Sequence, residues 1–166
     1  MAKRTLDERA LDDRVAIAEL NRLIEREANA VALLDVACAV LGGEARVEAL
    51  EAFRSDHERH ADRLAAAARA VGGATFQPSG PTALGRFEAI ALLGEMDTAG
   101  VLRALVVHER LALAAYERRL EAEFPAEARD ALEEAADDER RHLEWVREAA
   151  DDASALAVAS AAEPKP

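Results

Sequence analysis

Four long segments of the chain carry apolar residues at alternating steps of three and four positions, the spacing of a helix that buries one face. The first segment opens on Thr5-Leu6-Asp7-Glu8, a capping box, and runs to residue 41; the second covers about residues 44–71. The third covers about residues 98–123 and the fourth about residues 126–150. The pattern therefore predicts four amphipathic helices.

The segments between these helices predict how the helices are connected. Gly42-Gly43 ends the first helix, and Phe124-Pro125 separates the third from the fourth, so each pair should fold back as an antiparallel hairpin. Residues 74–82, ATFQPSGPT, have the composition of a connection, and a short helix over about residues 83–95 follows. We expect an all-α four-helix bundle with a long crossover between helices two and three that contains this short helix.

The last residues of the chain, 151–166, are small and polar and end in proline. Such a segment has little apolar surface to bury, so we expect disorder or fraying there. The predicted domain organisation is a bundle over residues 1–150 and a flexible tail over 151–166.

Composition supports an all-α fold and excludes some classes of binding partner. Hydrophobic residues make up 51% of the chain but aromatic residues only 4%, because alanine and leucine dominate. A net charge of −12 disfavours nucleic acid and anionic membranes and attracts cations. No apolar run approaches the roughly 20 residues of a spanning helix, and the single Cys38 has no partner for a disulfide. We therefore expect a cytoplasmic protein that binds no membrane.

Polar residues interrupt the apolar face of each predicted helix near its middle. Burial of an unpaired carboxylate costs several kcal/mol, so such residues need a proton, a partner or a metal ion. Folding each hairpin back at its turn brings the interruptions to one depth. They are Glu27 in the first helix, His57 and His60 in the second, Glu109 in the third, and Glu139 and His142 in the fourth.

The two hairpins also resemble each other. A shift of 82 residues superposes them without a gap, and Glu27 then falls on Glu109 and His60 on His142. The same shift places His57 on Glu139, so the match is not complete. Repetition of these polar residues indicates a duplicated hairpin. Further matching pairs are Leu20 with Leu102, Asp56 with Asp138, and Arg59 with Arg141.

Three carboxylates and three imidazoles at one depth suit one or two first-row metal ions, and iron, manganese and zinc all accept this mixed donor set. Glu139 and His142 are three residues apart, the spacing of the Glu-x-x-His pair in di-metal bundles. The alternative is a set of polar core residues that pair with one another. We favour the metal site, since a buried group of carboxylates would otherwise repel itself.

Taken with the duplicated hairpins, these residues resemble the ferritin-like di-iron carboxylate superfamily. The sequences FRSDHERHADRLAAAARAVGG and HERLALAAYERRLE also look like a small bacterial ferritin-like family of unassigned function, and the resemblance covers residues 11–150. It implies a ferritin-like four-helix bundle with iron as the cofactor. The ligands that it implies are Glu27, His60, Glu109, Glu139 and His142.

His57 departs from the superfamily pattern, which has at this position a glutamate that bridges two metal ions. Three outcomes are open. His57 ligates an ion itself, Asp56 takes the place of the missing glutamate, or the site holds a single ion on the remaining residues. Those residues are Glu27, Glu109, Glu139 and His142.

Around this site the sequence makes weaker predictions. We expect Asp56 and Asp138 on the solvated face, or in contact with the ligands at most, and His108 pointing outward. Tyr116 is expected to pack in the core or to donate a hydrogen bond to a ligating carboxylate.

The functional expectation is an iron-binding protein that oxidises Fe(II) or reduces O₂ or peroxide, a di-iron oxidoreductase of the ferroxidase or peroxidase type. The alternative is a helical bundle without enzymatic activity, an interaction or stress-associated protein whose metal site has degraded. A homodimer is a further expectation.

Overall fold

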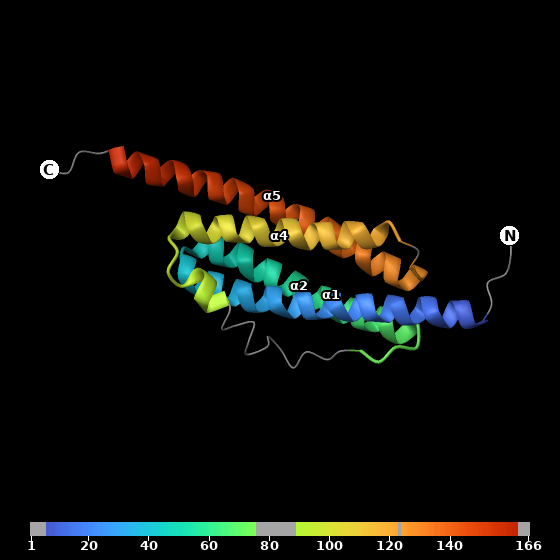
Figure 1. Cartoon of the computed structure of the whole chain (residues 1–166). Coiled ribbons are helices and arrows are strands. Elements are labelled where there is room, and N and C mark those ends of the chain that lie inside the picture. Colours follow the sequence, from blue (N-terminus) through green and yellow to red (C-terminus); the bar gives the residue numbers. More distant parts are fainter. Residues whose placement is uncertain (1–5, 76–88, 123, 163–166) are drawn as a thin grey trace.

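The computed structural model describes residues 6–75, 89–122 and 124–162. Four long helices dominate it (Figure 1): α1 (Leu6–Leu41), α2 (Glu44–Ala70), α4 (Thr98–Leu120) and α5 (Ala126–Ala162). Residues 89–93 form a short helical segment before α4, and no strand occurs among the described residues. The all-α prediction is confirmed; membership of the ferritin-like class stays a prediction.

Two of the predicted helix boundaries have a clear local cause. Gly42 and Gly43, between α1 and α2, adopt positive φ angles of 57° and 81°, which only glycine tolerates readily. Before α4, the side chain of Asp97 accepts a hydrogen bond of 2.7 Å from the backbone N–H of Gly100. Of the other predictions, Thr5 in the capping box and residues 83–88 of the short helix lie outside the described residues.

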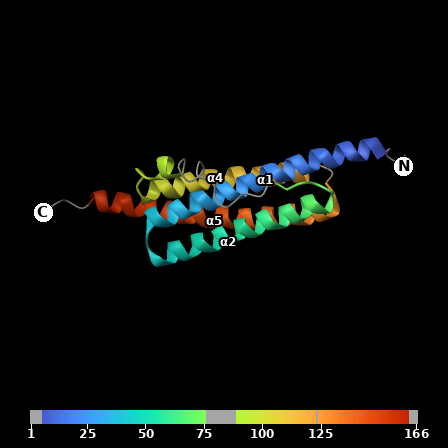
Figure 2. The ribbon, with the colours of Figure 1, turned by 90° about the horizontal axis from the view of Figure 1, so that it is seen from below.

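The helices pack as two antiparallel hairpins, α1 with α2 and α4 with α5. The hairpins meet through extensive contact between α2 and α5 and much slighter contact between α1 and α4. Figures 1 and 2 show that α2 and α4 run in the same direction. The chain between them therefore returns along the length of the bundle, as the predicted crossover requires.

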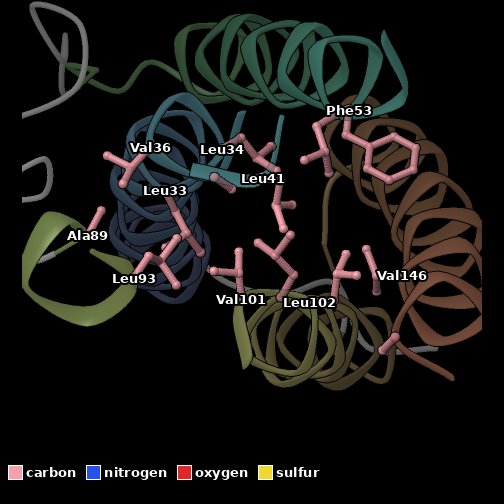
Figure 3. Close-up of a cluster of buried hydrophobic side chains, with 14 of the residues drawn as sticks. Leu33, Leu34, Val36, Leu41, Phe53, Ala89, Leu93, Val101, Leu102 and Val146 are labelled. Atoms are coloured by element: carbon pink, nitrogen blue, oxygen red, sulfur yellow. The ribbon is translucent and has the colours of Figure 1, made fainter. Parts of the chain in front are cut away.

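Buried apolar side chains form two clusters, one toward each end of the bundle. The first lies near the turn between α1 and α2, where side chains from all four long helices and from residues 89–93 meet (Figure 3). It includes Leu34, Leu50, Leu93, Leu102 and Val146. The second lies toward the opposite end and includes Leu20, Ile24, Leu64, Tyr116 and Leu132.

The gap between the two clusters contains the polar positions. On α1, Leu23 and Ile24 belong to the second cluster and Leu33 and Leu34 to the first, with Glu27 between them. In each of the other three long helices, polar residues likewise lie between residues of the first cluster and residues of the second. The middle of the bundle is thus a polar layer shielded from water by an apolar layer on either side.

The C-terminal part of α5 differs from the prediction. We expected the fourth helix to end near Ala150, but α5 continues to Ala162 and projects beyond the other helices (Figures 1 and 2). Alanine-rich sequence explains the extension, since alanine has the highest intrinsic helix propensity. The predicted end of the fourth helix near Ala150 is therefore wrong; the division into a bundle and a flexible tail stays a prediction.

Substitution of Leu102 by alanine tests the first apolar cluster. Leu102 is completely buried, so Leu102→Ala should lower the free energy of unfolding by about 2–5 kcal/mol through lost burial and a residual cavity. Val107 lies on the same helix and is 47% exposed, so Val107→Ala should change it by less than about 1 kcal/mol. Urea unfolding measures both values; equal losses would contradict the assignment of the cluster.

Candidate metal centre

The six predicted ligands lie together in the polar layer. α1 contributes Glu27, and α4 contributes Glu109. Each of the other two long helices contributes a pair three residues apart. None of the six residues is more than 1% exposed; the two pairs are His57 with His60 and Glu139 with His142.

Their ligand atoms fall into two groups, and within each group the atoms lie within 4.8 Å of one another. One group comprises Glu27, His57, His60 and Glu139. The other comprises His57, Glu109, Glu139 and His142. His57 and Glu139 therefore belong to both groups. This arrangement of carboxylate oxygens and imidazole nitrogens could hold a metal ion.

Glu27 is hydrogen-bonded on both oxygens. Its Oε2 lies 2.8 Å from His57 Nδ1 and 3.3 Å from His60 Nδ1, and the Tyr116 hydroxyl donates to Oε1 at 2.6 Å. Burial alone would raise the pKa of Glu27, but the two histidines outweigh it and hold that pKa well below its ordinary value. Burial likewise opposes protonation of His57, yet the charge of Glu27 raises the His57 pKa. Without metal, these two residues form an ion pair.

Glu109 and Glu139 have no such partners. All four of their carboxylate oxygens are buried and lack a hydrogen bond. Burial, followed by the charges of Glu109 and Glu27, raises the pKa of Glu139 to about 12. Burial acts in the same direction on Glu109, but nearby His142 and His57 outweigh it and lower its pKa to about 2. Two adjacent buried carboxylates thus hold a single negative charge, because ionisation of both would be repulsive.

The unpartnered atoms make the donor set suitable for a cation. Besides the four carboxylate oxygens, His57 Nε2 and His142 Nδ1 are buried without a hydrogen bond. A buried polar atom without a partner costs about 1–3 kcal/mol, and several such atoms in one layer are unusual in a stable core. A metal ion would satisfy them together and would replace the proton on Glu139.

Two aspartates orient the histidines at positions 60 and 142. His60 Nε2 lies 2.9 Å from Asp138 Oδ2, and His142 Nε2 lies 3.0 Å from Asp56 Oδ2. An aspartate in this place accepts the Nε2–H proton, so that in a neutral ring Nδ1 can give its lone pair to a metal ion; without the ion, His60 Nδ1 needs a proton of its own to donate to Glu27. In each ring Nδ1 faces the site, 3.3 Å from Glu27 in His60 and 3.7 Å from Glu109 in His142.

Two arginines join these aspartates into a closed ring on the α2–α5 side. Arg59 donates to Asp56 and to Asp138, both at 2.6 Å. Arg141 donates to Asp138 at 2.6 Å and to Asp56 at 2.8 Å. The aspartate side chains are only 14% and 11% exposed, so the favoured prediction of a solvated face is wrong for both. Because helix α2 packs closely on α5, these side chains turn toward the seam between them.

Sequence reasoning also misplaced His108. Its ring lies 6.4 Å from that of His57, centre to centre, and its Nε2 is buried, so it points inward rather than outward. The alternation of three and four along α4 assigned this position to the outer face. A repeat of 82 residues pairs His108 with Arg26, another half-buried residue that precedes a ligand, and that pairing was the missed signal.

Other aromatic residues behave as packing residues or hydrogen-bond donors. Tyr116 is fully buried and makes the predicted hydrogen bond to a candidate ligand, Glu27. The Phe53 ring stacks on His142 at 4.0 Å between centres, and Trp145 meets Phe53 edge-on at 5.4 Å. These contacts hold the His142 ring in place from the apolar side.

No family model, no curated protein and no solved structure matches this chain. Among the described residues, no helix is both long and apolar enough to cross a membrane.

A pH titration of stability tests the state of Glu139 in the metal-free protein. Its raised pKa means that the folded chain keeps the proton while the unfolded chain loses it above about pH 4.5, so stability falls as pH rises. Glu139→Gln mimics the protonated carboxyl and abolishes this loss, which amounts to at most about 1.4 kcal/mol per pH unit. As the pH rises from 4 to 9, the thermal unfolding temperature of the variant should increasingly exceed that of the native chain.

The exposed Glu148 on the same helix supplies the control, and Glu148→Gln should show no such trend. A constant difference between Glu139→Gln and the native chain across this range would contradict a protonated Glu139.

Proposed function

We propose that this protein is a ferritin-like bundle that binds iron in the polar layer and oxidises Fe(II) with O₂ or peroxide. One observation carries the proposal: six buried donor side chains converge from four helices, and the carboxyl oxygens of Glu109 and Glu139 have no hydrogen-bond partner. A duplicated hairpin with a Glu-x-x-His pair supports it.

The contrast between the carboxylates argues for a cation rather than for internal pairing alone. Glu27 has two histidines and a tyrosine as hydrogen-bond partners, whereas the adjacent carboxyls of Glu109 and Glu139 have none and hold a single negative charge. Internal pairing accounts for the first residue only. A divalent ion relieves the repulsion of the other two and stabilises the folded chain by mass action.

Iron is the metal that the donor set and the resemblance favour together. Mixed oxygen and nitrogen ligands also accept manganese and zinc, so the donor atoms by themselves select a class of ion. With three carboxylates and three imidazoles, the site offers enough donors for one or two ions.

The chain's own residues prepare the site in two ways. His60 and His142 present Nδ1 lone pairs because Asp138 and Asp56 hold the Nε2 protons. Tyr116 holds Glu27 in position through Oε1. Bound iron would supply one-electron chemistry, with Fe(II) as the electron donor and O₂ or peroxide as the acceptor.

Glu139 and His57 belong to both ligand groups, but they differ in how many donor atoms they can offer. A carboxylate has two oxygens and can serve both groups, while an imidazole that keeps its Nδ1 proton has one lone pair and serves one. His57 Nδ1 faces Glu27, which leaves Nε2 as the donor to a metal ion. The two groups are thus chemically different, with Glu139 as the residue able to join them.

The alternative function is that of a helical interaction protein without metal. The contacts of Glu27 favour it, because His57, His60 and Tyr116 satisfy that carboxylate with no ion present. In that case His57 serves as a structural replacement for a bridging glutamate.

Anaerobic loading with Fe(II), followed by elemental analysis, separates the two functions. We expect at least one ion per chain, and less than half of the native content in Glu109→Ala and His142→Ala, since each loses a donor from the same group. Glu148→Ala, on the exposed face of α5, is the matched control. Less than one iron ion per native chain would contradict the metal proposal. Unchanged iron content in both variants would favour the interaction protein.

Removal of an orienting aspartate should weaken metal binding without loss of the ligand itself. Asp56→Asn and Asp138→Asn disturb the tautomer of His142 and His60, and each should lower metal affinity by about 10- to 100-fold. Competition with a chelator of known affinity measures this change. Asp62→Asn, exposed on α2, is the control, and an equal effect there would show that only general charge matters.

A further inference from the structure

Two basic side chains border the metal centre on the side opposite the aspartate–arginine ring. Arg26 precedes Glu27 on α1, and His108 precedes Glu109 on α4, so the duplicated hairpins place a basic residue beside the same ligand twice. Neither residue belongs to the ligand groups described above. Their place is the α1–α4 side of the bundle.

Each of these side chains has a buried nitrogen without a hydrogen-bond partner, Nε in Arg26 and Nε2 in His108. Two other partly buried arginines are paired: Arg54 with Asp35 at 2.7 Å, and Arg119 with Glu19 at 2.5 Å. Among the described residues, Arg26 makes no ion pair. A permanent positive charge and two N–H groups are therefore available for an additional partner.

The two residues face the centre rather than solvent. The ring of His108 lies 6.4 Å from that of His57, although His57 comes from α2 on the opposite side of the polar layer. Arg26 also acts electrostatically on Glu139, whose carboxyl it favours in the charged form. A ligand held by Arg26 and His108 would consequently lie next to Glu109 and Glu139.

The helices pack less closely on this side of the bundle than on the other. α2 and α5 pack closely, and their seam carries the ring of Asp56, Arg59, Asp138 and Arg141. α1 and α4 touch far less.

We propose that Arg26 and His108 form a subsite for a small anion that ligates the metal ion from the α1–α4 side. The proposal rests on the metal site proposed above, because without a cation the carboxylates would repel an anion. A guanidinium and an imidazole N–H are the donors that proteins commonly use for oxyanions and similar small anions. The ligand class includes azide, phosphate and deprotonated peroxide.

Azide binding to the Co(II)-loaded protein tests this subsite, with the visible absorption of Co(II) as the readout. Loss of one charge-assisted hydrogen bond should raise the azide Kd about tenfold in Arg26→Gln and in His108→Gln, with Co(II) content per chain unchanged. Arg22→Gln, one turn earlier on α1 and exposed, should leave the Kd unaltered. Phosphate added as a competitor shows whether a tetrahedral oxyanion uses the same subsite.

The outcomes separate the two proposals. A native chain that binds no Co(II) overturns both, whereas Co(II) binding with a native azide Kd in Arg26→Gln and His108→Gln overturns the subsite alone. Arg26→Lys keeps the charge and should restore part of the affinity, which a purely structural role of Arg26 would not produce. Circular dichroism confirms that each variant is folded; if Arg26→Gln is not, Arg26→Lys and His108→Gln decide the question.

Discussion

Repulsion between buried carboxylates is the constraint on which the middle of this bundle depends. Glu27, Glu109 and Glu139 lie between two apolar clusters, where water cannot screen their charges. The repulsion is relieved differently at each carboxyl. Glu27 pairs with histidine, Glu109 stays ionised beside imidazoles, and Glu139 keeps its proton. Of the three carboxyls, only that of Glu27 has hydrogen bonds to other side chains on both oxygens.

The apolar clusters make the polar layer costly, and they also make it well defined. Since each long helix passes from one cluster to the other, a slip of one helix along another would move polar residues into an apolar layer. The polar layer therefore fixes the register of the four helices. In return, the clusters exclude water, which strengthens every electrostatic interaction within the layer.

Much of this arrangement could be predicted from the sequence. Apolar periodicity predicted the helices, and the reflection of Glu27 about Gly42-Gly43 correctly placed it beside His57 and His60. Other features depend on rotation about the helix axis, which periodicity determines only to within about one residue. Hence the inward turn of His108 and the seam positions of Asp56 and Asp138 were missed.

The end of α5 was missed for a different reason. The sequence after Ala150 lacks a hydrophobic stripe, and we took that as a signal for the end of the helix. Intrinsic propensity continues the helix without tertiary support, since no glycine or proline occurs between Asp151 and Ala162. A stripe thus indicates where a helix packs, and breaker residues indicate where it stops.

The crossed contacts between histidine and aspartate tie the two halves of the chain together. His60 of the first hairpin is oriented by Asp138 of the second, and His142 of the second by Asp56 of the first. Two identical hairpins related by a two-fold axis would form the same pair of contacts, because the histidine of each would meet the aspartate of the other. The single chain thus has the contact pattern of a two-fold dimer, and its two halves differ at His57 and Glu139. Because both halves contribute to one site, this single difference gives the two ligand groups different donor atoms.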